Sequence, residues 1–319
     1  MTVRLERIAF RAVGTDCSAA VTAGAEDRKR ARRALAAAHA EVAACEAALS
    51  RFDPSSDLSR LNRDAGSWVE VDERLVEALR LALHARVATA GRFDPTILPA
   101  LVAAGYDRSF ELLEERPPRP IDGWRAGEAV EVDEHGARAR IAAGAALDLG
   151  GIGKGYAAGR ALEAMREAWP SLPGAVVDLG GDLALWGRTP EGGPWRIDVA
   201  DPRSPGVIAG RLLLSGGGVA TSGRDIRRFG PGRSLHHLID PTTGEPAKPG
   251  PLAVTVVAPH AAEAEAHATA LAISSPVEAR AHVAANPQIS ALVVPHVGEP
   301  YALGALPLAQ TRVLVRVAS

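Results

Sequence analysis

The segment HHLIDPTTGEP, residues 236–246, gathers imidazoles, carboxylates, hydroxyls and turn-forming residues into one short stretch. An apolar pair leads into the dipeptide Asp240-Pro241. Because proline restricts the residue before it to extended geometry, Asp240 is expected at a strand end, and Gly244 can take a positive φ in the following turn. His237 and Asp240 are therefore predicted at a strand-to-turn corner, where catalytic side chains often lie. A polar hairpin turn without catalytic function explains the same pattern.

The rest of the chain mixes short strands with a few helices. A strand pair is predicted over residues 4–22, with a break at Gly14-Thr15. Helical apolar spacing without interior proline predicts helices at 27–49, 73–89, 154–168 and 261–272. Alternating segments between Gly and Pro turns predict strands near 129–133, 137–142, 175–178, 195–200, 207–214 and 252–257. Loops are predicted at 51–66 and 115–128. This order favours an α+β fold, and no break in composition divides residues 1–319, so a single domain is expected.

Composition argues against several classes of protein. Hydrophobic residues make up 47% of the chain, charged residues 23%, and the net charge is −2. No basic patch indicates nucleic-acid binding, and no apolar run reaches membrane-spanning length. The two cysteines, Cys17 and Cys45, form no disulfide framework and no metal motif. The N-terminal residues lack the apolar core of a signal peptide, so a cytoplasmic protein is expected.

The segment GGIGKGYAAG, residues 150–159, resembles nucleotide-binding loops. A P-loop would need glycine at Asp148 and a hydroxyl residue at Gly155, so that interpretation fails. Gly153, Gly155 and Ala158 fit the dinucleotide pattern G-x-G-x-x-A, without the surrounding βαβ unit. A Gly-rich entry into a helix offers backbone N–H groups to an anion. A tight packing turn is the alternative.

Lysine is rare in this chain, since the basic residues are almost all arginine. It occurs only as Lys29, Lys154 and Lys248. Lys154 lies inside the Gly-rich segment, where a flexible ammonium is suited to a phosphate group. Chance placement is the competing explanation.

The segment AEAEAHATA, residues 262–270, places Glu265 and Thr269 four residues apart on one predicted helical face. A carboxylate and a hydroxyl form a suitable oxygen site for Mg²⁺ when a phosphate supplies further ligands. His267 points elsewhere, which argues against a zinc helix. A solvated helix face is the alternative.

A hydrolase triad of Ser222, Asp225 and His237 is a further alternative. Ser222 lies in the sequence ATSGR and not on a G-x-S-x-G elbow. The pattern therefore gives the triad little support.

Several segments, in this order, resemble the blocks of the ApbE family, the FAD:protein FMN transferases. The likeness covers nearly the whole chain, and the blocks together are strongly specific. They are VGTDCSAAV at 13–21, RFDPSSDLSRLN at 51–62, GRFDPTILPAL at 91–101, LDLGGIGKGYAAG at 147–159, VVDLGGDLALWG at 176–187, VATSG at 219–223 and HHLIDPTTGEP at 236–246.

The resemblance implies a tandem T-fold-like α+β architecture with mixed or antiparallel sheets flanked by helices. It implies that FAD is the substrate and Mg²⁺ the metal. The implied reaction transfers the FMN half of FAD to a threonine hydroxyl of an acceptor flavoprotein, with AMP as the leaving group. Such a reaction depends on positioning and charge neutralisation more than on covalent chemistry.

Carried over by position, the resemblance also implies site residues. His237 would be the base for the acceptor hydroxyl, with His236, Asp240 or Asp94 as competitors. Lys154 would lie near the phosphates. The metal would be held by the Gly153 carbonyl and the side chains of Glu265 and Thr269. The FAD pocket would be lined by Val13, Phe52, Phe93, Asp94, Gly150, Lys154, Tyr156 and Ile239.

This chain departs from the family pattern at informative positions. Glu265 stands where the family usually has aspartate, and Mg²⁺ is strict about geometry. Gly153 replaces alanine, and Val13 replaces methionine. Two alternatives therefore stay open. One is a Mg²⁺-dependent FAD pyrophosphatase that uses water in place of the acceptor, and the other is a flavin-binding protein without catalysis.

Overall fold

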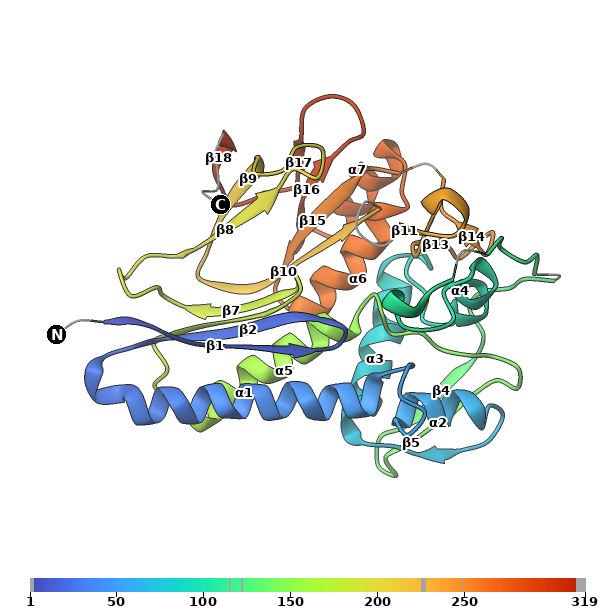
Figure 1. The fold of residues 1–319 in the computed structure, drawn as a ribbon, viewed down its shortest axis with the longest axis horizontal. Helices are drawn as coiled ribbons and strands as arrows, with labels where there is room; N and C mark the ends of the chain where they lie inside the picture. The colour runs from blue at the N-terminus through green and yellow to red at the C-terminus, as the bar shows by residue number, and fades with distance from the viewer. Residues whose placement is uncertain (1–2, 115, 122, 225–227, 249, 314–319) are drawn as a thin grey trace.

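The computed structural model describes residues 3–114, 116–121, 123–224, 228–248 and 250–313. Helices and strands are mixed along these ranges, and every strand pairing in them is antiparallel. The prediction of an α+β fold is therefore confirmed (Figure 1). No helix within the described ranges is long and apolar enough to cross a membrane.

The helices agree well with the periodicity of the sequence. They are α1 (Arg28–Leu49), α2 (Asp57–Arg63), α3 (Glu73–Ala88), α4 (Leu98–Ala104), α5 (Gly153–Ala168), α6 (Ala261–Ala272) and α7 (Pro276–Ala285). The short helices α2, α4 and α7 were not expected from the sequence. The predicted loop at 51–66 was wrong in part, because α2 forms inside it. Its N-cap, Ser56, accepts a hydrogen bond from the backbone N–H of Ser59, as capping serines do.

One large antiparallel sheet organises the molecule. Its strands, in spatial order, are β1 (Arg4–Ala12), β2 (Thr15–Ala23), β6 (Gly174–Leu179), β7 (Leu183–Gly187), β10 (Gly216–Gly223), β15 (Ala253–Ala258), β16 (Ser290–Val294) and β17 (Tyr301–Leu303). Two small sheets have the orders β18 (Leu308–Val313), β9 (Ile208–Leu214), β8 (Trp195–Ala200) and β3 (Val69–Glu70), β5 (Arg138–Ile141), β4 (Val130–Asp133). Two short pairs are β11 (Arg228–Phe229) with β12 (Leu235–His236), and β13 (Ile239–Asp240) with β14 (Glu245–Pro246).

Both faces of the large sheet are buried at its β15–β16 end. Val254 and Ala291 belong to a core shared with α6 and α7, whereas Ala253 and Leu292 belong to a core shared with β8 and β9. Neighbouring residues of a strand point to opposite faces, so a sheet covered on both sides needs continuous apolar strands. This explains the uninterrupted apolar sequence of β16, which was not recognised as a strand.

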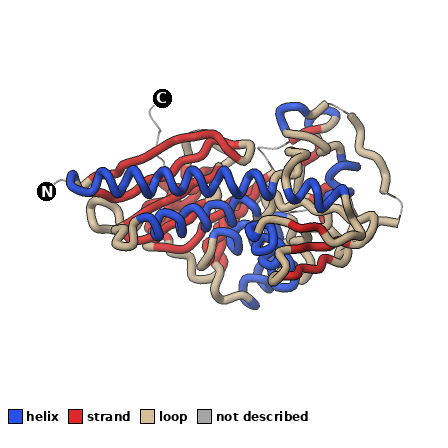
Figure 2. Tube along the Cα trace, turned by 90° about the horizontal axis from the view of Figure 1, so that it is seen from below, coloured by secondary structure: helices blue, strands red, loops and turns tan. Residues whose placement is uncertain are grey.

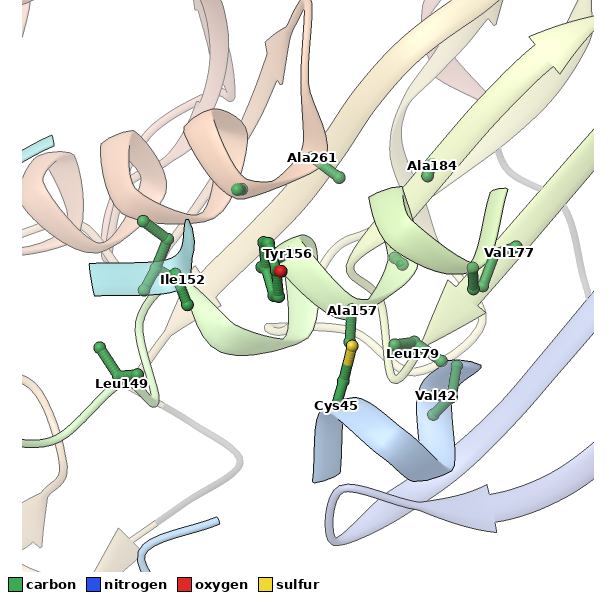
Figure 3. Close-up of a cluster of buried hydrophobic side chains, with 14 of the residues drawn as sticks. Val42, Cys45, Leu149, Ile152, Tyr156, Ala157, Val177, Leu179, Ala184 and Ala261 are labelled. Atoms are coloured by element: carbon green, nitrogen blue, oxygen red, sulfur yellow. The ribbon is translucent and has the colours of Figure 1, made fainter. Parts of the chain in front are cut away.

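A layer of alanine-rich helices covers the other end of the sheet. Helices α1 and α5 run alongside one another against the strands (Figure 2). Figure 3 shows Cys45 of α1 pointing toward Ala157 of α5 within this buried cluster. Small side chains let the helices approach closely, and Gly155 of α5 lies tightly against the start of α6. A Cβ placed there would lie 2.3 Å from the carbonyl oxygen of Ala261, at the start of α6.

This approach predicts opposite effects for two alanine substitutions in α5. Gly155→Ala should lower the free energy of unfolding by about 1–3 kcal/mol, because backbone must move to admit the methyl group. Gly159→Ala is the matched control, since nothing lies within 4 Å of its added Cβ. It should raise stability by about 0.5–1 kcal/mol, through the higher helix propensity of alanine. Urea unfolding of both variants tests this, and equal effects would contradict the close packing.

A buried histidine pair joins α6 to α7. Nδ1 of His267 lies 2.8 Å from Nε2 of His282. Burial and the neighbouring His282 and His84 lower the pKa of His267 to about 4, and burial with nearby Arg92 lowers the pKa of His282. Glu263 lies 4.0 Å from the other ring nitrogen of His267. Two imidazoles that share one hydrogen bond cannot both be charged in this interface.

The pair predicts acid sensitivity of the fold. Between about pH 6.5 and about pH 4, His267 is protonated in the unfolded chain but neutral in the folded protein. The free energy of unfolding therefore falls as pH falls. By pH 5 the loss should be about 1–2 kcal/mol relative to pH 7. The double variant His267→Leu, His282→Leu should show a shallower decrease in Tm between pH 7 and pH 5. Because His236 also titrates in this window, some slope should remain; an unchanged slope would contradict the assignment.

Candidate functional site

The Gly-rich segment forms a tight turn that opens helix α5. The backbone N–H groups of Ile152 and Gly153 both donate to the Leu149 carbonyl, at 3.1 and 2.7 Å. Asp148 stabilises the turn, because its Oδ1 accepts a hydrogen bond from the N–H of Gly150 at 2.8 Å. The same carboxylate pairs with Arg51 at 2.5 Å. The predicted helix entrance is present, and the N–H of Gly155 in its first turn is directed toward α6.

Lys154, on this first turn, lies between two carboxylates. Its Nζ is 2.9 Å from Oε1 of Glu265 on α6, and it also contacts the carboxylate of Asp182 in the β6–β7 turn. Only 3% of Glu265 and 2% of Asp182 is exposed, while the Lys154 side chain is 20% exposed. The structure therefore brings together two of the predicted site residues, Lys154 and Glu265. Asp182 is a third member that was not predicted.

Glu265 also contacts the backbone of α5. Its Oε2 accepts a hydrogen bond of 2.7 Å from the N–H of Gly155. The first N–H groups of a helix have no partner within the helix, and an acceptor with negative charge suits them. The packing-turn and anion-site interpretations of the Gly-rich loop therefore both describe part of the structure: Gly155 packs closely, and its N–H binds a carboxylate.

Thr269 lies one helical turn beyond Glu265. Its Oγ1 is 3.5 Å from Oγ of Ser222 on β10. A Cβ placed on Gly151 would lie 2.9 Å from this Oγ1 and 3.2 Å from Cε2 of Phe93. Thr269, Phe93 and the Gly-rich loop are thus adjacent. By contrast, a Cβ on Gly153 would approach only Leu149, at 3.8 Å, so alanine would fit at that position.

The donor atoms at this place suit a hard cation. The hydroxyls of Thr269 and Ser222, the carboxylate of Glu265 and the backbone carbonyls of the loop supply only oxygen, which Mg²⁺ prefers. Both oxygens of Glu265 already accept from Lys154 and Gly155, so a cation would have to share this carboxylate. In the described part of the chain, no three His, Cys, Asp or Glu side chains gather into a metal-binding group.

An aromatic cluster lies beside Arg51. Phe52 is 42% exposed, and its ring centroid is 6.1 Å from that of Tyr106. The Tyr106 ring in turn lies 5.6 Å from Phe229. The Arg51 guanidinium lies over Phe52 at 4.1 Å from the ring centroid. Buried Ile239 belongs to the same apolar cluster as Tyr106 and Phe229, so two predicted pocket residues, Phe52 and Ile239, adjoin one aromatic surface.

Asp94 is buried in a turn that supports the loop. Its Oδ1 accepts from the N–H and the hydroxyl of Thr96, at 2.8 and 2.7 Å, and its Oδ2 lies 3.2 Å from Nε of Arg86. The next residue, Pro95, accepts a hydrogen bond from the N–H of Asp148 at 2.8 Å. These contacts join the sequence blocks at 91–101 and 147–159. The Asp94 carboxylate is thus already bound to Thr96 and Arg86, which have structural roles.

Tyr156 lies inside the helix layer. It is 4% exposed, and its hydroxyl donates to Oε2 of Glu77 on α3 at 2.7 Å. Arg160 bridges the same carboxylate at 3.1 Å and Glu41 of α1 at 3.3 Å. Burial raises the pKa of the Tyr156 hydroxyl, with the adjacent Glu77 adding to the shift. The charged network, which the sequence did not reveal, fixes α5 against α1 and α3.

Val13 occupies a strained position in the β1–β2 turn. Val13 and Gly14 have φ of 46° and 70°, as a two-residue hairpin of type I′ requires. A β-branched residue with positive φ is unusual, and such strain is often found at functional sites. The Val13 N–H donates to Oε1 of Glu46 at 2.8 Å, which holds the turn against α1.

The segment at 236–246 forms the predicted strand-to-turn corner. Asp240 ends β13, and its Oδ1 accepts from the N–H and hydroxyl of Thr242 at 2.9 and 2.6 Å. Gly244 has a φ of 71°, as expected. Burial, together with the neighbouring Arg224 charge, lowers the pKa of His236 to about 4, so this imidazole is neutral near pH 7. His237 is half-buried beside it.

The hydrolase triad gains no support from these contacts. Ser222 contacts Thr269, as described above, and Asp225 lies outside the described residues. Asp182 was missed because its partner, Lys154, is distant in sequence. The Gly180-Gly181 pair after an apolar strand was the available signal for a carboxylate presented at a tight turn.

Comparisons with known proteins identify the family of this chain. Residues 13–293 match the model of the ApbE family. FAD:protein FMN transferase of Salmonella typhimurium is 28% identical over 77% of this chain and 73% of its own length. The Treponema pallidum protein of the same name is 32% identical over 70% of this chain and 67% of its own.

Comparison with solved structures also leads to the ApbE family. The crystal structure of the ApbE protein from Thermotoga maritima superposes with a TM-score of 0.80 at 28% identity, covering 94% of this chain and 97% of that one. The flavinyl transferase ApbE from Pseudomonas stutzeri, at 23% identity, shares the fold with a TM-score of 0.78. Because the family model matches most of the length of this chain, the chain belongs to the ApbE family.

Proposed function

We propose that this protein is a Mg²⁺-dependent FAD:protein FMN transferase that moves FMN from FAD to a threonine hydroxyl of an acceptor flavoprotein and releases AMP. One observation carries the proposal. A Gly-rich helix entrance, an ammonium (Lys154), a buried carboxylate (Glu265) and a hydroxyl (Thr269) converge where α5 meets α6. N–H groups, a cation and hard oxygen ligands are the groups that a diphosphate with a divalent ion requires.

The flavin would lie against the neighbouring aromatic surface. Phe52 is the exposed member of that surface, and Ile239 is a buried neighbour. Buried Phe93 and Tyr156 belong to the core beside the Gly-rich loop and would shape the pocket from that side. Further proposed pocket positions are Val13, Asp94 and Gly150. Lys154 would contact the diphosphate. The relatives' name, FAD:protein FMN transferase, supports FAD as the substrate.

In the proposed reaction the acceptor oxygen forms a bond to the FMN phosphorus, and the P–O bond to the AMP phosphate breaks. His237 would take the proton from the acceptor hydroxyl, since imidazole is a suitable general base and this side chain is half-buried directly after a strand. Asp240 would support the corner through its turn hydrogen bonds. Bound Mg²⁺, held by Glu265, Thr269 and the Gly153 carbonyl, would supply charge neutralisation on the diphosphate.

The test is transfer to an acceptor. The protein is incubated with FAD, Mg²⁺ and an acceptor flavoprotein that carries the target threonine, and the acceptor is examined by intact mass. The expected result is a mass gain of one FMN with release of AMP. Free FMN and AMP without acceptor labelling would instead indicate a pyrophosphatase, and intact FAD would indicate a flavin-binding protein.

The metal assignment predicts a specific variant. Glu265→Gln removes the charge of the proposed ligand with little change in volume, so transfer should fall by at least 100-fold. Thr269→Val should act in the same direction but more weakly, because it removes a neutral ligand. Initial rates across a Mg²⁺ titration measure both effects. Wild-type rates for Glu265→Gln at low Mg²⁺ would place the metal elsewhere.

A further inference from the structure

The β6–β7 turn brings to Lys154 a buried carboxylate that has no part in the proposed reaction. Gly180 and Gly181, with φ of 71° and 97°, make the tight reversal that precedes Asp182. The N–H of Gly181 donates to Oδ1 of Asp178 at 2.8 Å, which fixes the turn. Asp182 is 2% exposed, and a carboxylate so deeply buried needs a partner of opposite charge. That partner is Lys154.

The Lys154 ammonium is shared by two elements of the fold. Asp182 reaches it from the β6–β7 turn, and Glu265 reaches it from α6. Because an ammonium has three N–H donors, both contacts leave a donor for a ligand. Two carboxylates and one ammonium leave the cluster with one net negative charge, which favours a nearby cation.

Glu265 has two competing partners in the proposed function. As a metal ligand it would lie beside a divalent cation, and that cation repels the adjacent ammonium. Lys154 would then have Asp182 as its remaining carboxylate partner in the cluster. Without Asp182 the flexible lysine would regain rotamer freedom that phosphate binding must remove again.

We propose that Asp182 is a positioning residue that retains Lys154 at the entrance of α5, directed at the substrate diphosphate, when Glu265 binds the cation. The inference rests on the proposed function and extends it by one residue. Loss of the Asp182 charge could also help an anion to bind. The loss of positioning of Lys154 should outweigh this effect, because the Asp182 charge is already compensated by direct contact with Lys154.

Ligand affinity separates anchoring from a general structural role. FAD and FMN are titrated by calorimetry, with Mg²⁺ and with EDTA, into wild type, Asp182→Asn, Lys154→Met and the double variant. Asp182→Asn should weaken FAD binding roughly ten-fold, the size of one lost charge-assisted hydrogen bond. FMN, which lacks the diphosphate, should change by less than about two-fold on the same reasoning. In the Lys154→Met background, Asp182→Asn should cause no further loss.

Lysine reactivity gives a direct second measurement. The chain has only three lysines, and Lys29 and Lys248 are exposed, so they serve as internal references. Acetylation followed by peptide mass analysis reports each lysine separately. Lys154 should react several-fold faster in Asp182→Asn than in wild type, because a side chain released from the buried carboxylate is more accessible to the reagent. Lys29 and Lys248 should be unchanged.

Asp201→Asn is the matched control. Asp201 is a buried turn aspartate that pairs with Arg203 between β8 and β9, away from α5. The Asp201→Asn variant should have a lower Tm than wild type but the same ratio of FAD affinity to FMN affinity. If Asp182→Asn does not fold, Asp182→Glu replaces it, and its displaced carboxylate should likewise weaken FAD binding.

The outcomes are distinguishable. Wild type that binds no FAD and transfers no FMN would refute the proposed function. Wild type that binds FAD, with unchanged affinity in Asp182→Asn or equal losses for FAD and FMN, would refute only the role of Asp182. An equal loss in the Lys154→Met background would do the same.

Discussion

The contact between Glu265 and the first turn of α5 is the interaction on which the site depends. One carboxylate accepts from the Gly155 N–H and from Lys154, so it fixes the backbone and the side chain of the loop at once. The contact is possible only because α5 and α6 approach closely at Gly155, where any side chain would meet the Ala261 carbonyl. Packing and electrostatics therefore impose the same geometry.

This geometry bears on Glu265, the position at which the family resemblance led us to expect aspartate. Glu265 is almost fully buried on α6, and its two oxygens reach different groups on α5. The longer side chain spans the helix interface, and Thr269 lies one turn away on the same face of α6. The substitution is thus accommodated by the close helix approach without loss of a carboxylate at the site.

The sequence predicted the features that are local. Helical periodicity gave α1, α3, α5 and α6 to within a few residues, and the Asp-Pro and glycine signals gave the corner at Asp240. It missed β10, whose first residues are glycines, and β16, whose apolar run lacks alternation because both faces are buried. Strand and turn signals fail where tertiary burial, and not local propensity, selects the conformation.

Contacts between distant segments were beyond local reasoning. The sharing of Lys154 by Asp182 and Glu265, and the network of Tyr156 with Glu77, join residues whose separation in sequence carries no signal. The family resemblance proposed Lys154 and Glu265 as site residues but did not show that they touch. Their contact changes how the candidate site is understood, because the residue proposed to bind phosphate and the residue proposed to bind the metal form an ion pair with each other in this structure.

That mutual binding has a thermodynamic consequence for the proposed reaction. A diphosphate that draws Lys154 away from Glu265 frees a carboxylate for the cation. A cation that binds Glu265 frees the ammonium for the diphosphate. By linkage, each ligand must then strengthen the other by the same factor, beyond their direct attraction. The first ligand to bind must break the ion pair, and the second ligand then binds to groups that are already free, so this arrangement favours the complete substrate–metal pair over free flavin or free cation.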